Sequence, residues 1–191
     1  MKNRGLSAEA TRSRILQATL ELATEKLTVE IVLADIAARA GVTVQTILRH
    51  FGGREGLFDA VVLFGAVEIV AERVAPVGDI AEAVRVVVDH YETRGDWSIA
   101  LLGQETSDER IRGVTALGKQ THRDWVLAVF APQLAEIGPF TGGAIADLLT
   151  VATDVYTWKL LRRDRGLGRS EVEQRMHYLV DAIVASAVKG N

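Results

Sequence analysis

The chain has 191 residues, of which 48% are hydrophobic, and it carries a formal net charge of −3. It contains no cysteine, which excludes a disulfide framework, a thiol nucleophile and a thiolate metal site. No apolar run approaches the roughly 20 residues that span a bilayer, and the charged N-terminus lacks the apolar segment of a signal peptide, so we expect no membrane association and a cytoplasmic location.

Charge is distributed unevenly along the chain. Residues 1–55 contain eight Lys and Arg against six Asp and Glu, whereas the rest contains fourteen against nineteen, so the two parts carry +2 and −5. A basic end on an acidic body can orient a protein on DNA. This modest asymmetry favours a DNA-binding role for the N-terminal region.

The first two predicted elements are helices, because their apolar residues recur with helical spacing. The first is Thr11–Lys26, with Thr11 available as its N-cap. The second, Leu33–Ala40, is short and is followed by Gly41, a residue type that often ends helices.

The next stretch, residues 42–51, contains many β-branched residues, which are common in strands. A half-buried strand would place Ile47 on its polar face. A helix instead collects the apolar residues on one side, at positions i, i+3, i+4 and i+7. These residues are Val44, Ile47, Leu48 and Phe51. Thr43 can cap this helix and Gly52 can end it, so we predict a helix over Thr43–Phe51.

The remaining segments are also helical by periodicity. Gly56–Val74 is a longer, apolar helix that carries Leu57, Phe58, Val61, Phe64, Val67 and Val70. Pro76 and Gly78 mark a break. The predicted helices after it are Ile80–Tyr91, Trp97–Glu105 and a long helix that begins at Ser107 or Asp108. A predicted loop at 131–143 then precedes the last two helices, Ala144–Arg165 and Ser170–Lys189. We therefore predict an all-α protein of about nine helices, with a domain at 1–55, a connecting helix at 56–74 and a larger domain at 76–191.

Leu33–Ala40 and Thr43–Phe51 together form a predicted helix-turn-helix. Ala37 is small enough to let the two helices cross closely, and Gly41 can adopt the positive φ that the turn needs. The same pattern also occurs in αα-corners that do not bind DNA.

Several motifs around this element resemble a known family. They are "RILQATLELATEK", "DIAARAGV", "TILRHF" and "GGREGLFDAV", which follow one another between residues 14 and 61. This region is similar to the N-terminal DNA-binding domain of the tetracycline-repressor (TetR) family of helix-turn-helix transcriptional regulators. The resemblance implies a homodimer that binds a palindromic DNA operator, most often as a repressor, and that responds to a small molecule bound in the larger domain.

The resemblance also implies which residues contact DNA. Thr43–Phe51 becomes the recognition helix, with Ile47 and Phe51 facing inward. The implied contacts are Thr43, Val44, Gln45, Thr46, Leu48, Arg49, His50, Arg54 and Arg12, with Arg4 and Arg14 nearby. Val44 and Leu48 are apolar where the family usually has polar residues, and Val32 replaces a common Thr cap, so we expect fewer phosphate contacts and a shallower salt dependence.

The larger domain would bind the ligand and form the dimer. Large residues with a polar group are the candidate ligand contacts: Trp97, His122, Trp125 and Tyr156. The alternative, a hydrogen-bonded core cluster, is the more common situation for such residues. The ligand itself is expected to be largely apolar. Ala144–Arg165 is apolar on two faces, which predicts burial on two sides. The candidate interface residues are Val151, Trp158, Leu161, Met176, Leu179 and Ile183.

An enzyme and a protein-interaction adaptor are the two alternatives to a DNA-binding regulator. An enzyme has little support, because the four histidines lie on separate predicted helices without metal-ligand spacing, so we expect no catalytic residues, no metal and no cofactor. A helical protein-interaction adaptor without specific DNA binding is the second alternative. Enrichment of a palindrome from random DNA would separate a regulator from an adaptor.

Overall fold

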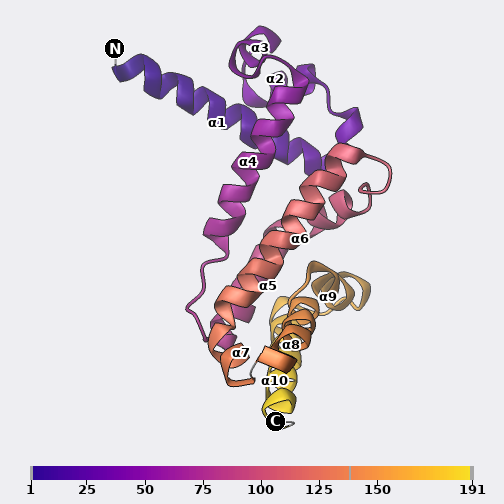
Figure 1. Cartoon of the computed structure of the whole chain (residues 1–191). Helices are drawn as coiled ribbons and strands as arrows, with labels where there is room; N and C mark the ends of the chain where they lie inside the picture. Colours follow the sequence, from indigo (N-terminus) through magenta and orange to yellow (C-terminus); the bar gives the residue numbers. More distant parts are fainter. Residues whose placement is uncertain (1, 138, 190–191) are drawn as a thin grey trace. The chain divides into compact units, whose positions relative to one another are not determined.

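The computed structural model describes residues 2–137 and 139–189 of the chain. Over these residues the protein is helical and contains no strand, which confirms the all-α prediction (Figure 1). The chain forms two compact units, Met1–Ile69 and Val70–Asn191. Among the helices of the described residues, none is long and apolar enough to cross a membrane.

The N-terminal unit contains α1 (Lys2–Glu25), a short 3-10 helix η1 (Thr28–Glu30), α2 (Leu33–Ala40), α3 (Val44–Phe51) and most of α4 (Arg54–Glu72). Its core contains fully buried aliphatic side chains from α1 to α4 and from the residue that follows η1, including Ile15, Leu16, Ile31, Ile36, Ile47 and Leu57. The predicted start of the first helix was wrong. Thr11 lies inside α1, where its hydroxyl donates to the carbonyl oxygen of Ser7 at 2.8 Å instead of capping the helix.

Only the first half of α4 has a buried apolar face. Leu57, Phe58 and Val61 are buried, but Val67 is 71% exposed and Val70 is also exposed. The core of the N-terminal unit therefore covers only the first turns of α4.

The second unit is formed by the remaining helices. They are α5 (Ile80–Leu102), α6 (Glu109–Val129), α7 (Ala131–Ile137), α8 (Pro139–Ala152), α9 (Val155–Lys159), a π-helical turn η2 (Leu160–Asp164) and α10 (Arg169–Lys189). The last helix packs against α5 and α8, with α8 and α10 side by side in Figure 1. A single apolar core joins these helices, with Trp158, Phe130, Leu149 and Met176 fully buried in it.

A break predicted near Gly95 is absent, and α5 continues through it to Leu102. Gly95 is buried, and a Cβ atom added there would lie 2.6 Å from Cη2 of Trp158. The glycine therefore lets a large ring approach the helix axis and does not end the helix.

Two further predictions in the second unit need correction. The loop predicted at 131–143 is helical over its described residues, because α7 occupies 131–137 and the start of α8 occupies 139–143. Conversely, the predicted helix Ala144–Arg165 is interrupted after Ala152. Asp154 caps a new helix there, since its carboxylate accepts a hydrogen bond from the backbone N–H of Tyr156 at 2.8 Å.

Candidate functional site

The turn between α2 and α3 has the geometry of a helix-turn-helix. Gly41 ends α2 with φ of 64°, and the backbone N–H of Val42 donates to the carbonyl oxygen of Ala37 at 2.9 Å. Ile36 and Ala37 of α2 and Ile47 of α3 are buried in the N-terminal core. The positive φ is favourable for glycine, so the sequence fixes the turn locally.

The helix α3 is held at its start by a side-chain cap. Thr43 accepts a hydrogen bond from the backbone N–H of Thr46 at 3.2 Å, and the two hydroxyl oxygens lie 3.0 Å apart. Gly52, with φ of 77°, ends the helix. The predicted helix and its cap are therefore confirmed, in spite of the β-branched residues in this stretch.

The outer side of α3 combines polar and apolar residues. Val44, Gln45 and Arg49 are exposed, whereas Thr46, Leu48, His50 and Phe51 are half-buried. Ile47 is completely buried, as expected for an inward-facing residue. A rigid, capped helix thus presents an amide, a guanidinium and aliphatic groups to its surroundings, which are groups that can read base edges in a major groove.

The positive charges of the N-terminal unit are only partly neutralised within it. Arg39 pairs with Glu25 at 2.8 Å, and Lys26 pairs with Asp35 at 2.8 Å. Within residues 2–137 and 139–189, Arg12, Arg14 and Arg49 form no ion pair. The guanidinium of Arg12 lies 5.4 Å from the ring centroid of Phe51, so it sits at the end of α3. These cations can therefore contact phosphate.

Arg54 has a structural role that sequence reasoning missed. Its Nη2 donates to the carbonyl oxygen of Thr28 at 2.7 Å, and its Nε donates to that of Ile31 at 3.3 Å. Its guanidinium also lies 4.5 Å from the ring centroid of Phe58. Arg54 thus joins the start of α4 to the turn that follows η1. No local sequence pattern signals a contact between residues so far apart in the chain.

Of the four candidate ligand contacts, the structure brings His122 and Trp125 together. Their rings are stacked, with centroids 5.9 Å apart. Trp97 is half-buried, and its indole Nε1–H is buried without a hydrogen-bond partner among the described residues. Tyr156 is 54% exposed at the start of α9.

His122 belongs to a buried polar network that includes an arginine missed by sequence reasoning. Arg73 follows α4, and its Nη2 lies 2.6 Å from Nδ1 of His122. The indole of Trp125 donates to the backbone carbonyl of Arg73 at 2.7 Å. Burial lowers the pKa of His122 to about 3 and that of His90 to about 4, and the charge of Arg73 acts in the same direction. Both histidines are consequently neutral at physiological pH.

The six candidate interface residues divide into three groups. Trp158 and Met176 are fully buried in the core of their own chain, so their predicted place on an exposed face is wrong. Val151 is 63% exposed and Leu179 is also exposed, while Leu161 and Ile183 are half-buried. Further exposed apolar side chains lie on α8, α9, η2 and α10, namely Leu148, Tyr156, Leu160, Tyr178 and Val188.

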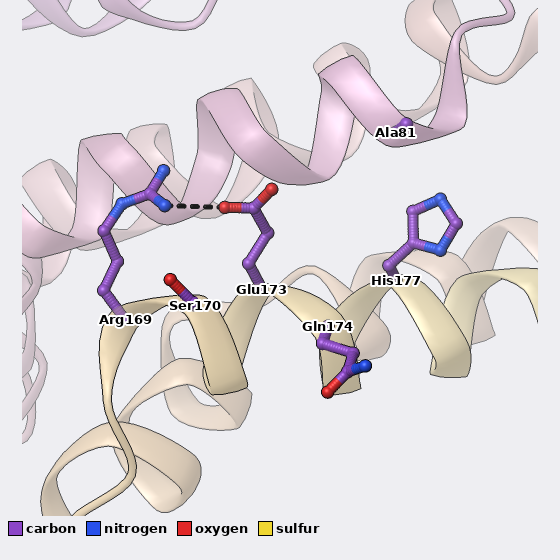
Figure 2. Close-up of a pocket in the computed structure, with 6 residues that line it drawn as sticks. All are labelled: Ala81, Arg169, Ser170, Glu173, Gln174 and His177. Atoms are coloured by element: carbon purple, nitrogen blue, oxygen red, sulfur yellow. Dashed lines mark hydrogen bonds and ion pairs between the residues drawn. The ribbon is translucent and has the colours of Figure 1, made fainter.

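A polar hollow of about 410 Å³ lies on the second unit and is lined by Ala81, Arg169, Ser170, Glu173, Gln174 and His177. Figure 2 shows Arg169, Glu173 and His177 extending from α10 toward the helix that carries Ala81. Arg169 is engaged there with Glu173 at 2.7 Å and also with Asp89. The guanidinium of Arg169 is therefore already paired with carboxylates of its own chain.

Comparison with known proteins agrees with this geometry. Residues 15–61 match the family of bacterial regulatory proteins described as the tetR family. No match was found among curated proteins.

Two solved structures share the fold over nearly the whole chain. A transcriptional regulator from Rhodococcus sp. Rha1 is 19% identical, with a TM-score of 0.70 over 93% of this chain and 97% of the other. A tetR-family transcriptional regulator from Streptomyces coelicolor is 18% identical, with a TM-score of 0.73 over 96% of this chain and 84% of the other. Residues 15–61 are therefore similar to the tetR family of bacterial regulatory proteins, and the chain as a whole shares its fold with these two structures.

Proposed function

We propose that this protein is a DNA-binding transcriptional regulator of the TetR family, and specifically a homodimeric repressor that binds a palindromic operator through α3 and is released by a small molecule with a largely apolar body. The observation that carries the proposal is the capped helix α3, which exposes Gln45 and Arg49 beside cations that have no internal ion pair. Residues 1–55 would then bind DNA, the helix after them would connect, and residues 76–191 would bind the ligand and form the dimer.

Each side chain of α3 would have a distinct role at the operator. Gln45 can form a bidentate pair with adenine, and Arg49 can pair with guanine or a phosphate. Arg12, beside Phe51, would contact the phosphate backbone. Val44 can contact a thymine methyl group but donates no hydrogen bond. Recognition of this kind makes few phosphate contacts, so binding should weaken with salt less steeply than for a protein that makes many.

Exposed apolar side chains on the last helices support the homodimer. Val151 and Leu148 on α8 and Tyr178 and Leu179 on α10 are all exposed, although α8 and α10 pack together. A two-fold axis would place the same patch of two copies in contact and remove it from water. Such a dimer presents two α3 helices to half-sites about one turn of DNA apart, ~34–36 Å.

The ligand would act by changing the separation of the two recognition helices. A coupling of about 1–3 kcal/mol between the ligand and DNA sites is sufficient for a 5- to 150-fold change in affinity. A cytoplasmic location follows from this proposed role.

An adaptor that does not bind specific DNA is the second candidate. Val32, at the N-cap of α2, makes no side-chain cap, and both Val32 and Val44 are exposed. An apolar surface of this kind also suits contact with a protein.

Selection of bound sequences from random DNA separates the two candidates. We expect the full chain to enrich a palindrome whose half-sites are one helical turn apart, and a member of a small-molecule panel to reduce that enrichment. Failure to enrich any sequence would favour the adaptor. Enrichment of a single half-site by a monomeric protein would contradict the homodimer alone.

A further inference from the structure

The buried arginine of the second unit, Arg73, lacks a counter-ion. Its side chain is only 6% exposed. Its guanidinium lies 4.5 Å from the ring centroid of Trp125 and 6.0 Å from that of Tyr91. Its Nε–H is buried and has no hydrogen-bond partner among the described residues. A charged group therefore lies between aromatic rings with unused donor capacity.

Among the described residues, the guanidinium of Arg73 makes a single side-chain hydrogen bond, and its partner is a neutral group. Arginine can only donate, so Nδ1 of His122, at 2.6 Å from Nη2, must be the acceptor. The proton of that imidazole then resides on Nε2, which lies 3.2 Å from the carbonyl oxygen of Thr150 and donates to it. His122 is held in one tautomer and contributes no negative charge.

Nearby carboxylates are engaged elsewhere. Glu72 binds Arg94 and accepts a hydrogen bond from His90 at 2.9 Å. Asp154 caps α9 through the backbone N–H of Tyr156. Within residues 2–137 and 139–189, no carboxylate lies within ion-pair distance of Arg73. A buried guanidinium without an anion is costly for the fold, because it stays protonated and loses its hydration. Such a cost is typical of groups that are kept for binding.

We propose that Arg73 binds the carboxylate of a small-molecule effector whose remaining part is apolar or aromatic. One guanidinium and one carboxylate form a neutral buried pair with matching planar geometry, whereas a phosphate monoester would leave excess negative charge in the interior. The aromatic surroundings, Trp125 with Phe130 edge-on at a centroid distance of 6.1 Å, suit the apolar part of the ligand. This inference rests on the proposed ligand-responsive function and adds the chemical class of the ligand.

Binding to the full chain, free of DNA, tests the inference. The probes are benzoate, 1-naphthoate and decanoate, each compared with its uncharged carboxamide by calorimetry. We expect at least one carboxylate to bind about 10- to 100-fold more tightly than its carboxamide, because a hydrogen-bonded charge pair contributes that much. The variant R73M should remove this preference and leave the affinity for the carboxamide unchanged. The surface variant R85M, which loses only exposed pairs with Glu82 and Asp89, should behave as the wild type.

A purely structural role of Arg73 gives different results. R73M should then unfold at a lower temperature than the wild type. The wild type should also bind each of the three carboxylates with the same affinity as the corresponding carboxamide. Equal affinities, or a carboxylate preference that persists in R73M, would overturn the inference. If R73M does not fold, the inference is tested with R73Q and with the comparison of each acid and its amide on the wild type.

The outcomes also separate this inference from the proposed function. A protein that enriches a palindrome but shows no carboxylate preference refutes this inference alone. Carboxylate binding without DNA enrichment refutes the proposed function alone.

Discussion

Trp158 packs its indole ring directly against Gly95 of α5, so that a Cβ atom on Gly95 would lie 2.6 Å from Cη2 of the ring. Trp158 is fully buried, and its Nε1 donates to a carboxylate oxygen of Glu92 at 2.9 Å. The ring is therefore fixed both by packing and by a hydrogen bond. The absence of a side chain at Gly95 is what brings α5 and α9 into close contact.

We predict that G95A lowers the free energy of unfolding. Overpacking typically costs about 1–3 kcal/mol, which exceeds the roughly 0.5–1 kcal/mol that alanine gains over glycine within a helix. The measurement is urea unfolding followed by circular dichroism. The matched control is G118A on α6, where an added Cβ meets no atom within 4 Å, so stability should rise. Equal stabilisation by G95A and G118A would contradict the close packing.

This pair also shows which features a sequence can predict. Thr43–Phe51 was predictable because its cap, its helical periodicity and its terminal glycine all lie within ten neighbouring residues. The function of Gly95 depends on Trp158, which is distant in the chain, so a glycine that permits close packing was interpreted as a helix break. The same limitation hid the carbonyl contacts of Arg54 and the burial of Arg73, because neither leaves a periodic pattern.

The predicted dimer interface shows the same limitation of the sequence. The helical spacing of the apolar residues of α10 does not tell which of them face the chain's own core. Met176 lies in that core and Leu179, three residues later, is exposed. Burial on two sides was inferred from an uninterrupted helix at Ala144–Arg165, whereas the cap at Asp154 starts a separate helix.

We predict that V151D converts the proposed dimer to a monomer. The side chain of Val151 is 63% exposed in the single chain, so aspartate should not disturb the core, but two carboxylates in an apolar interface would remain unpaired. Analytical ultracentrifugation should show half the mass of the wild type, with an unchanged circular dichroism spectrum. The control L117D, at an exposed leucine on α6, should keep the mass of the dimer. A dimeric V151D would exclude this face as the interface.

We predict different effects for substitutions at Gln45 and Arg54. Q45A should relax the preference at one base pair in each half-site, with a loss of about 1–3 kcal/mol on the preferred operator and little loss on other DNA. R54Q should weaken binding to all sequences alike and reduce the salt slope by about 1. It should also lower the stability of the free protein, because the hydrogen bonds from the guanidinium to the carbonyl oxygens of Thr28 and Ile31 are lost.

Binding to the operator and to random DNA at several salt concentrations, together with urea unfolding, separates these effects. Q45A should unfold as the wild type does, because Gln45 is exposed on α3. A uniform loss of affinity for Q45A, or a sequence-dependent loss for R54Q, would reverse the assignment of base-reading and phosphate-binding roles.

We predict that stability decreases below neutral pH because of two buried histidines. Burial lowers the pKa of His122 to about 3 and that of His90 to about 4, whereas histidines of the unfolded chain titrate near pH 6.5. Between these values the unfolded state binds more protons, so the free energy of unfolding should fall as the pH drops below about 6.5, by about 1.4 kcal/mol per pH unit for each histidine. Above about pH 7.5 the two histidines should contribute no pH dependence.

Urea unfolding between pH 7.5 and 5 tests this expectation and avoids most carboxylate titration. H122Q, whose amide oxygen can still accept from Arg73, and H90Q should each remove about half of the slope, and the double variant should remove both contributions. A full slope in H122Q would show that its imidazole is already protonated in the fold, and the donor–acceptor arrangement with Arg73 would then be wrong.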